Sequence, residues 1–475
     1  MSDDSRRSPD RLHHGDATAR IDAPAISPRF GDLLMNALED RSRIACRTHR
    51  ERMPPRAERS VRIGLCLMVA WSLTNAFGEG NVGADEPHVW PLERLNQAPE
   101  FRWIDDRSPV RSLAYGNEPF RGEPTEVFAF YATPGTLAGD PSLDRDLPAV
   151  VLVHGGGGTA FEEWARLWAE RGYAAIAMDL AGARPITGRN PHEASSREPM
   201  EHAGPGQGDD EKFGVIDLPL DQRWTYHAVA AIIRAHSLVR SFPEIDRSRT
   251  AVTGISWGGY LTCIVAGVDD RFAAAVPVYG CGFLGDNSAW LGQFARMNET
   301  QRERWLSHWD PSVHLPRVSM PILFVNGTND GAYPLDSYVR SYDLVPGEKR
   351  ICVTVNMPHS HPAGWAPVEI GRFIDQVLLG KRPLVHLDRP TAENDRWSCR
   401  VVGPTEAASA QLHWTGVSDA PINRREWQTR DVAVVDGRLD IGSLPADAVI
   451  WFVTARDDSG AVVSSTLFGI DGVTD

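Results

Sequence analysis

Short apolar runs alternate with amphipathic stretches through the middle of the chain. The runs are too short for buried helices and have the length of buried strands, and helical periodicity fills the segments 161–171 and 224–239 between them. Buried strands that alternate with helices predict a mostly parallel sheet with helices on both faces, which is an α/β fold. The predicted parallel strands are 149–153, 174–178, 250–253, 274–278, 322–325 and 351–355, preceded by a hairpin of 110–115 and 126–131.

The pattern changes after about residue 383. Short β-rich pieces recur between turns at 410–414, 431–435, 449–454 and 461–467, and no helical period is present. This pattern predicts a small all-β sandwich over 383–475. The segment LGKRP at 379–383 reads as a linker, so the α/β domain is predicted to cover 81–382.

The N-terminal part has a different pattern again. Residues 1–52 are polar and poor in large apolar side chains, which predicts disorder. An apolar run at 63–73 follows Arg56, Arg59 and Arg62, and this order is typical of a signal peptide, here 53–80. The true start would then be Met53 and 1–52 an over-extension of the reading frame; the alternative is a buried helix after a disordered tail. The signal predicts a periplasmic or secreted protein without stable membrane insertion after its removal, since the run is short for a span.

Composition narrows the function classes. The 475 residues are 42% hydrophobic and 24% charged, as expected for a globular chain of two or three domains. A net charge of −14 argues against a nucleic-acid partner. The six cysteines have no metal-ligand spacing, and Cys263 and Cys352 lie in apolar runs that suit buried side chains. We therefore predict neither a metal nor an organic cofactor, and the sequence leaves disulfides and oligomeric state open.

The strongest chemical motif is GISWGG at 254–259. It follows the apolar run TAVT and precedes a helical pattern, so it has the context of a nucleophile elbow, a tight strand-to-helix turn that exposes a serine. Glycines on either side permit the turn because they have no Cβ. Ser256 is the predicted nucleophile, placed at a helix N-terminus that favours a developing anion.

A glycine-rich loop, HGGGG at 154–158, directly follows the strand AVVLV. It lacks the GK[ST] of a phosphate-binding P-loop and the spacing of a dinucleotide-binding loop. An ordinary glycine turn is the plainer interpretation. Together with the elbow, the loop predicts an oxyanion hole formed by the backbone N–H of Gly156 or Gly157 and that of Trp257, with His154 in a structural role.

An acid and a base follow in the order that α/β-hydrolases use. Asp330 ends NGTND after the strand at 322–325, and Asp336 is a fallback that looks like a helix-capping residue. Two histidines, His359 and His361, follow the strand at 351–355. We prefer His361 as the base from its spacing to the strand, with His359 as the alternative, because a small residue follows His359.

These motifs resemble those of the α/β-hydrolase superfamily over about residues 85–380. SWGGYLT and NGTNDGAYPLDS are similar to segments of the acetyl xylan esterase, dienelactone hydrolase and prolyl oligopeptidase branch. The resemblance implies a triad of Ser256, Asp330 and one of the two histidines. The chain departs from that branch in lacking a propeller, in having HxH where most members have one histidine, and in carrying its own β-rich tail.

Two further features allow more than one interpretation. The Gly/Pro-rich insert at 182–219 has the length of a lid or binding loop, and its acidic cluster 209–211 suits solvation better than cation binding. Trp290, Trp305 and Trp309 could form a sugar platform, although packing inside a cap is the plainer interpretation.

The resulting hypothesis is a secreted serine carboxylesterase that removes short acyl groups, acetyl above all, from small-molecule or polysaccharide esters. The resemblance implies that these are carbohydrate esters. The alternatives are a prolyl oligopeptidase-like serine peptidase and a non-catalytic glycan-binding protein. A sequence that holds all three triad residue types in order argues against the non-catalytic protein.

Overall fold

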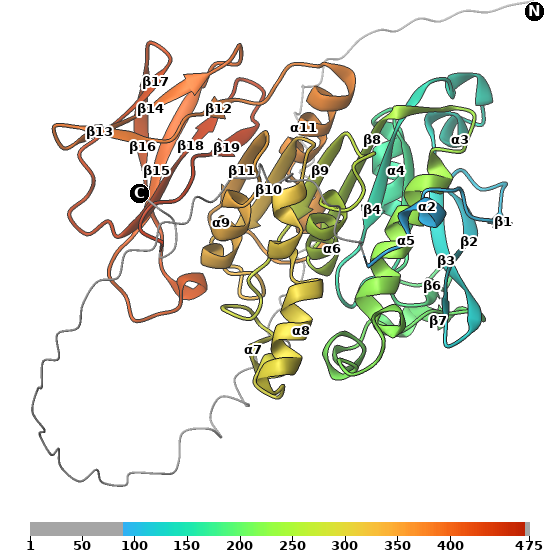
Figure 1. The fold of residues 1–475 in the computed structure, drawn as a ribbon. Coiled ribbons are helices and arrows are strands. Elements are labelled where there is room, and N and C mark those ends of the chain that lie inside the picture. Colours follow the sequence, from blue (N-terminus) through green and yellow to red (C-terminus); the bar gives the residue numbers. More distant parts are fainter. Residues whose placement is uncertain (1–88, 471–475) are drawn as a thin grey trace, which may run out of the picture. The chain divides into compact units, whose positions relative to one another are not determined.

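The computed structural model describes residues 89–470. The predictions for 1–52, for the signal peptide 53–80 and for residues 81–88 lie outside this range. The chain is traced through its helices and strands in Figure 1.

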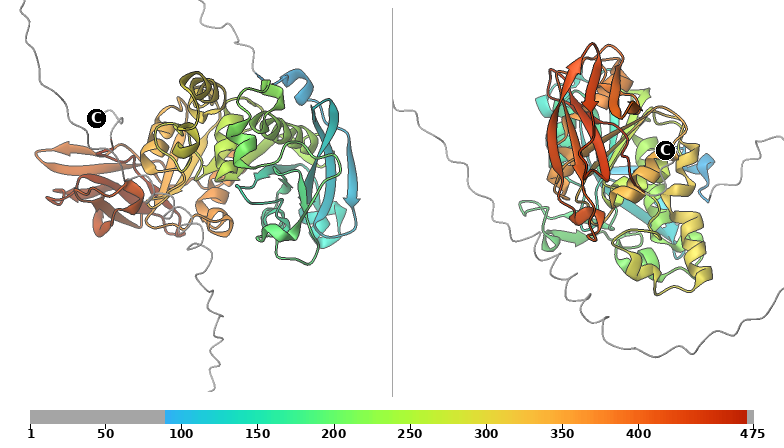
Figure 2. Two further views of the ribbon diagram at one scale, coloured as in Figure 1. Left: turned by 90° about the horizontal axis from the view of Figure 1, so that it is seen from below. Right: turned by 90° about the vertical axis from the view of Figure 1, so that its left-hand side faces the viewer.

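Parallel strands form the centre of the main sheet, in the spatial order β5, β4, β8, β9, β10, β11. Every residue of β4, β5, β9 and β10 is buried, because helices cover both faces of this part of the sheet (Figure 2). The predicted α/β architecture is confirmed. The strands are β4 (Leu147–Val153), β5 (Ala174–Met178), β8 (Ile245–Ile255), β9 (Ala274–Val278), β10 (Ile322–Gly327) and β11 (Lys349–Thr354).

An antiparallel extension continues the sheet beyond β5. β3 pairs with β5, β2 with β3 and β1 with β2, all antiparallel. The predicted hairpin is therefore present, with longer strands than the apolar runs alone indicated. Its strands are β1 (Phe101–Asp105), β2 (Arg111–Phe120) and β3 (Glu123–Ala132), and the insert adds a small hairpin of β6 (Ala183–Pro185) and β7 (Arg197–Pro199).

Five of the described helices pack on strands of the main sheet. α4 contacts β5 and β3, α5 contacts β2 and β5, α6 contacts β8 and β9, α9 contacts β10, and α11 contacts β8 and β9. Their bounds are α4 (Glu162–Glu170), α5 (Trp224–Val239), α6 (Trp257–Ala266), α9 (Leu335–Asp343) and α11 (Val368–Leu379). The other α-helices of the described range are α2 (Leu92–Leu95), α3 (Pro134–Ala138), α7 (Leu291–Phe294), α8 (Glu299–Trp309) and α10 (His361–Trp365).

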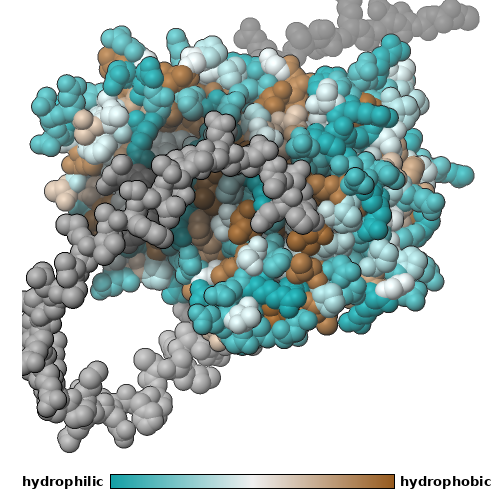
Figure 3. All heavy atoms as spheres, in the orientation of Figure 1, coloured by the Kyte–Doolittle hydropathy of each residue, from teal (hydrophilic) through white to brown (hydrophobic). Residues whose placement is uncertain are grey.

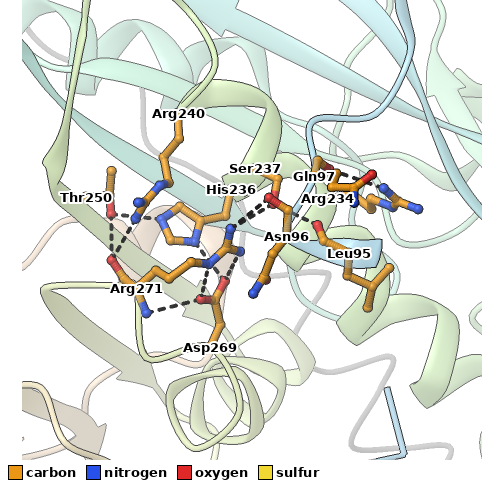
Figure 4. A network of polar contacts seen from close by, with 10 residues as sticks. All are labelled: Leu95, Asn96, Gln97, Arg234, His236, Ser237, Arg240, Thr250, Asp269 and Arg271. Atoms are coloured by element: carbon orange, nitrogen blue, oxygen red, sulfur yellow. Dashed lines mark hydrogen bonds and ion pairs between the residues drawn. The ribbon is translucent and has the colours of Figure 1, made fainter. Parts of the chain in front are cut away.

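A buried polar network joins α5 to the loop before β9 (Figure 4). His236 on α5 is fully buried, and its Nδ1 lies 2.8 Å from Asp269 Oδ2 while its Nε2 lies 2.8 Å from Thr250 Oγ1. Arg271 donates to the same carboxylate at 2.7 Å. Burial lowers the pKa of His236, so the ring is held neutral with Nδ1–H donated to Asp269. This histidine–aspartate pair is enclosed in the core and fixes the fold rather than offering a site.

Hydrophilic and hydrophobic residues are mixed on the face of the molecule that Figure 3 shows. Along the periphery of the face in Figure 3, hydrophilic residues predominate and hydrophobic ones are scattered among them. The large apolar side chains that are exposed, such as Leu143, Val368 and Val417, come from separate elements. Scattered exposure of this kind needs no partner to explain it.

The C-terminal part is built of antiparallel strands, as the sequence predicted. β15 pairs with β16 and β18, while β14 pairs with β12, β13 and β17, and β16 also pairs with β17. The strands are β12 (His386–Leu387), β13 (Thr391–Glu393), β14 (Arg396–Val402), β15 (Ser409–Thr415), β16 (Gln428–Val435), β17 (Arg438–Gly442), β18 (Ile450–Arg456) and β19 (Val462–Ser464).

A strand of this β-rich part joins the edge of the main sheet. β19 pairs antiparallel with β11, and the backbone N–H of Val353 donates to Ser464 Oγ at 2.8 Å. The carboxylate of Glu369 on α11 accepts from the backbone N–H of Val462 at 2.6 Å. The β-rich part therefore covers an edge strand whose residues Ile351, Cys352 and Val353 are buried.

Removing the β-rich part is expected to destabilise the α/β domain. A chain that ends at Arg382 would leave the apolar edge of β11 without its partner strand, and such edges promote aggregation. We expect a lower yield of soluble protein and a Tm several degrees below that of the full chain, measured by size-exclusion chromatography and thermal unfolding. A monomeric truncated form with an unchanged Tm would contradict this expectation.

Candidate active site

The turn between β8 and α6 holds Ser256 in a strained backbone conformation. Its φ is 59° and its ψ is −117°, values that a non-glycine residue rarely adopts. The glycines around it leave no space for a side chain: a Cβ on Gly254 would lie 2.2 Å from the Gly258 carbonyl oxygen, and one on Gly258 would lie 2.0 Å from that of Val153. Ser256 is half-buried while its neighbours in the turn are buried. The turn therefore presents the serine as a nucleophile elbow does.

The side chain of Asp330, three residues after the end of β10, is fixed by backbone donors. Its Oδ1 accepts from the N–H groups of Ala332 and Tyr333, both at 2.8 Å. Its Oδ2 lies 2.7 Å from Nδ1 of His359. The carboxylate is almost fully buried, whereas the side chain of His359 is 32% exposed. A buried carboxylate on Nδ1 orients the imidazole and leaves Nε2 to exchange a proton.

The loop that carries His359 is fixed by Tyr279, a residue that the sequence gave no reason to select. The phenol ring of Tyr279 stacks on the imidazole with centroids 4.4 Å apart, and its hydroxyl donates to the Pro358 carbonyl at 2.7 Å. Tyr279 itself has a positive φ of 64° directly after β9. The ring and the hydroxyl together hold the histidine against its acid.

His361, the histidine preferred as the base, does not hold the position beside Asp330, which His359 occupies. It lies next to the glycine loop, where a Cβ on Gly155 would be 3.1 Å from its Nε2 and 3.0 Å from the Cβ of Ser256. It begins α10, and its Nε2 accepts from the backbone N–H of Gly155 at 2.9 Å. Its ring centroid lies 4.8 Å from that of Phe161. Burial, and then the neighbouring His154 and His192, lower the pKa of His361 to about 3, so the ring is neutral with its Nε2 lone pair already used.

Asp336, the fallback acid, serves as a local structural group. It lies in the first turn of α9 and accepts from the side-chain amide of Asn287 at 2.7 Å. The N-cap of α9 is Pro334 and no side chain caps the helix, so the expected capping role of Asp336 is not seen.

The glycine loop after β4 has two backbone N–H groups without a protein acceptor among residues 89–470, those of Gly156 and Gly157. The N–H of Gly155 is used by His361, and that of Gly158 donates to the Gly155 carbonyl at 3.1 Å. Gly156 packs directly on the nucleophile's neighbour, because a Cβ there would lie 2.7 Å from Cδ1 of Trp257.

His154 has the structural role predicted for it. It is buried, its Nε2 accepts from the Leu180 N–H at 2.9 Å, and its Nδ1 lies 2.7 Å from the Gly155 carbonyl oxygen. With Nε2 accepting, Nδ1 carries the proton and donates it to that carbonyl. The side chain thus fixes the start of the glycine loop.

The alternative sites considered from the sequence do not form. Trp305 and Trp309 are each 1% exposed and pack in the core, so they make no sugar platform, and Trp290 packs against Trp257 with centroids 4.5 Å apart. Asp209 binds the side-chain amide of Gln293 at 2.8 Å.

Within the part of the chain that the structure describes, no group of three or more His, Cys, Asp or Glu side chains is placed to hold a metal ion. The cysteines in this part, Cys263, Cys281, Cys352 and Cys399, are buried free thiols.

The fold and the strand-end positions of these groups define the α/β-hydrolase class. Ser256 follows β8, Asp330 follows β10, His359 follows β11 and the glycine loop follows β4, so all four lie at carboxyl ends of strands in one sheet. Residues 127–373, just over half of the 475, match the acetyl xylan esterase (AXE1) family, and the chain belongs to that family. The predicted superfamily and branch are confirmed.

Three individual esterases are similar to parts of this chain at low sequence identity. The acetyl esterase Axe7A of Xylanibacter ruminicola is 23% identical over 228 residues, 45% of this chain and 49% of its own length. The chain thus spans about half the length of this curated relative. The acetyl xylan esterase of Paenibacillus sp. R4 is 22% identical with a TM-score of 0.47, covering 60% of this chain and 92% of its own. Acetyl xylan esterase 1 of Thermoanaerobacterium sp. JW/SL YS485 is 17% identical with a TM-score of 0.45, covering 61% and 92%.

Proposed function

We propose that the protein is a serine esterase that hydrolyses short acyl esters, with Ser256, His359 and Asp330 as its triad. The observation that carries the proposal is the Asp330–His359 pair at the same sheet edge as the strained Ser256 turn. Membership of the acetyl xylan esterase family supports an ester as the substrate.

The reaction follows from the roles that the geometry allows. Ser256 attacks the acyl carbonyl, and Nε2 of His359 takes the serine proton and later delivers it to the leaving alcohol. Asp330 stabilises the imidazolium because its Oδ2 accepts from Nδ1. Water then attacks the acyl-enzyme with the same histidine as base, which releases the acid and restores the serine.

The oxyanion of the tetrahedral intermediate requires donors that are free and already in place. The N–H groups of Gly156 and Gly157 are unbonded in the described chain, and the N–H of Trp257 is the first of α6, where a helix has no acceptor for it. His361 supports this loop by holding the Gly155 N–H. We therefore assign the oxyanion hole to Trp257 with Gly156 or Gly157.

The substrate class that we propose is an acetyl ester on a carbohydrate, xylan above all. The description of the matching family, acetyl xylan esterase, supports the acetyl group and the polysaccharide, and the name of the similar acetyl esterase supports the acetyl group. No cofactor enters this chemistry.

We also propose that the protein is periplasmic or secreted, from the signal pattern at 53–80. Export agrees with the proposed substrate class, because a polysaccharide substrate lies outside the cell. Among residues 89–470, no helix combines the length and the apolarity that a membrane span requires.

Activity is expected to fall as the acyl chain lengthens. The bulky Trp257 stands beside the glycine loop, and each misfitted methylene costs about 1–3 kcal/mol at best. kcat/KM for nitrophenyl esters should therefore decrease from acetyl to octanoyl, and acetylated xylan should release acetate. A rise toward octanoyl would indicate a lipase-like pocket. Faster cleavage of a Pro-amide peptide than of any ester would favour the peptidase alternative.

A further inference from the structure

The insert between β5 and α5, residues 182–219, contacts both sides of the proposed oxyanion hole. On the first side, Nη2 of Arg197 donates to the Gly157 carbonyl, and it also reaches the Pro191 carbonyl at 3.4 Å. Gly157 has a φ of +66° and no side chain of its own to fix it. That carbonyl belongs to the peptide group that carries the Gly158 N–H. The contact therefore fixes the peptide group that follows Gly157 and restrains the rotation of Gly157, whose own N–H is one of the two candidate donors.

On the second side, Lys212 lies over the indole of Trp257. Its Nζ is 4.6 Å from the Trp257 ring centroid and 5.2 Å from that of Trp224, which is cation–π distance. The ammonium also donates to the Gln207 carbonyl at 2.6 Å. Burial lowers the pKa of Lys212 to about 8, so the side chain is still mostly cationic at neutral pH.

The segment that carries Lys212 is locked against aromatic residues outside the insert. Trp305 on α8 donates its indole N–H to the Lys212 carbonyl at 2.9 Å. The neighbouring Phe213 stacks on the same indole with centroids 5.2 Å apart and an interplanar angle of 17°. Lys212 therefore has a fixed position above Trp257, while Gly156 packs against the Cδ1 edge of that indole.

We propose that Arg197 and Lys212 are positioning residues of the oxyanion hole, so that the insert sets the geometry of the hole from outside the sheet. Arg197 orients the glycine-loop donors through the Gly157 carbonyl, and Lys212 holds Trp257, whose backbone N–H is the other donor. This proposal rests on the function proposed above. It assigns the insert a part in transition-state stabilisation, in addition to any contact with the substrate.

An oxyanion hole acts on the transition state, so its misplacement should lower kcat more than it raises KM. Loss of a whole donor costs about 10²–10³ in kcat, and a displaced donor should cost less. We expect Arg197→Ala and Lys212→Met each to lower kcat on an acetyl ester about 10- to 100-fold while KM changes less than about threefold. The affinity for a trifluoromethyl ketone, a mimic of the tetrahedral intermediate, should fall by the same factor as kcat/KM.

Conservative variants and a matched control make this test specific. Arg197→Lys keeps one donor for the Gly157 carbonyl and should restore most of kcat. Arg189→Ala removes another arginine of the insert, one that donates to the Ser195 carbonyl at 3.2 Å, and should leave the kinetics unchanged. Circular dichroism and thermal unfolding check the fold of each variant, and Lys212→Met decides the test if Arg197→Ala does not fold.

The two proposals fail in different ways. A wild-type protein without esterase activity would overturn the proposed function. An active wild type whose folded Arg197 and Lys212 variants keep their kcat, or lose only KM, would overturn the role of the insert while the triad stands.

Discussion

Replacement of Ser256 by alanine is expected to lower kcat on an acetyl ester by at least on the order of 10⁴, because triad members act as a unit and the acyl-enzyme can no longer form. The backbone of Ser256 donates to the Val278 carbonyl and accepts from the Tyr260 N–H, both at 2.8 Å, and alanine keeps both bonds, so the fold should stay intact. The measurement is kcat for nitrophenyl acetate with the wild type and the variant at equal concentration of folded protein.

Ser360 provides a matched control for this experiment. Its side chain caps α10 between the two histidines by accepting from the Ala363 N–H at 3.2 Å. Ser360→Ala should keep kcat within about threefold, since a lost helix cap costs only ~1 kcal/mol of stability. A Ser256→Ala variant that retains a tenth of the wild-type kcat would refute the assignment of the nucleophile.

Single alanine variants of His359 and His361 should lose very different fractions of kcat. His359→Ala removes the group bound to Asp330 and should lower kcat by about 10⁴. His361→Ala removes a neutral acceptor for the Gly155 N–H and should lower kcat about tenfold or less, through a looser glycine loop. Both values come from initial rates on the same ester.

The pH dependence of kcat tests the roles of His359 and His361 independently. Because the pKa of His361 is lowered to about 3, its ring stays neutral throughout pH 5–9 and cannot cause the acidic limb of the kcat profile there. His361→Ala should therefore lower kcat by the same factor at every pH between 5 and 9 and leave the apparent pKa of the acidic limb unchanged. If His361→Ala loses about 10⁴ while His359→Ala keeps most of its kcat, the roles are reversed and the contact with Asp330 is structural.

The sequence predicted those parts of the site whose geometry is local. The strands at 174–178 and 274–278 agree with the structure at both ends, because each is a continuous apolar run of the length of a buried strand. The elbow around Ser256 was recognisable because its glycines leave no room for a Cβ. Asp330 was recognisable from its position just after β10.

The base could not be chosen from spacing, because the loop after β11 reverses direction. Asn356 has a positive φ of 55°, and Pro358 follows, so counting residues from the strand does not say which histidine turns toward Asp330. The anchor that decides it, Tyr279, lies 80 residues earlier and has no motif. The tryptophans were ambiguous for a similar reason, since only the tertiary packing shows Trp305 and Trp309 to be buried.

The sequence predicted the strands of the β-rich part but not their pairing with the main sheet. Its strands were predicted from alternation and turns, whereas the pairing of β19 with β11 depends on a contact between residues 351 and 464. No local pattern in either segment encodes such a partner. The boundary at 382 remains a prediction, and the shared sheet edge means that a cut there removes a strand from the main sheet.

The most direct test of the proposed mechanism is covalent labelling with a fluorophosphonate, followed by mass spectrometry of the peptides. A serine activated by His359 should form a single adduct, located on the peptide that contains Ser256, and the Ser256→Ala and His359→Ala proteins should show little or none at the same reagent concentration and time. An adduct on another serine, or labelling of the His359→Ala protein at the wild-type rate, would contradict the triad proposed here.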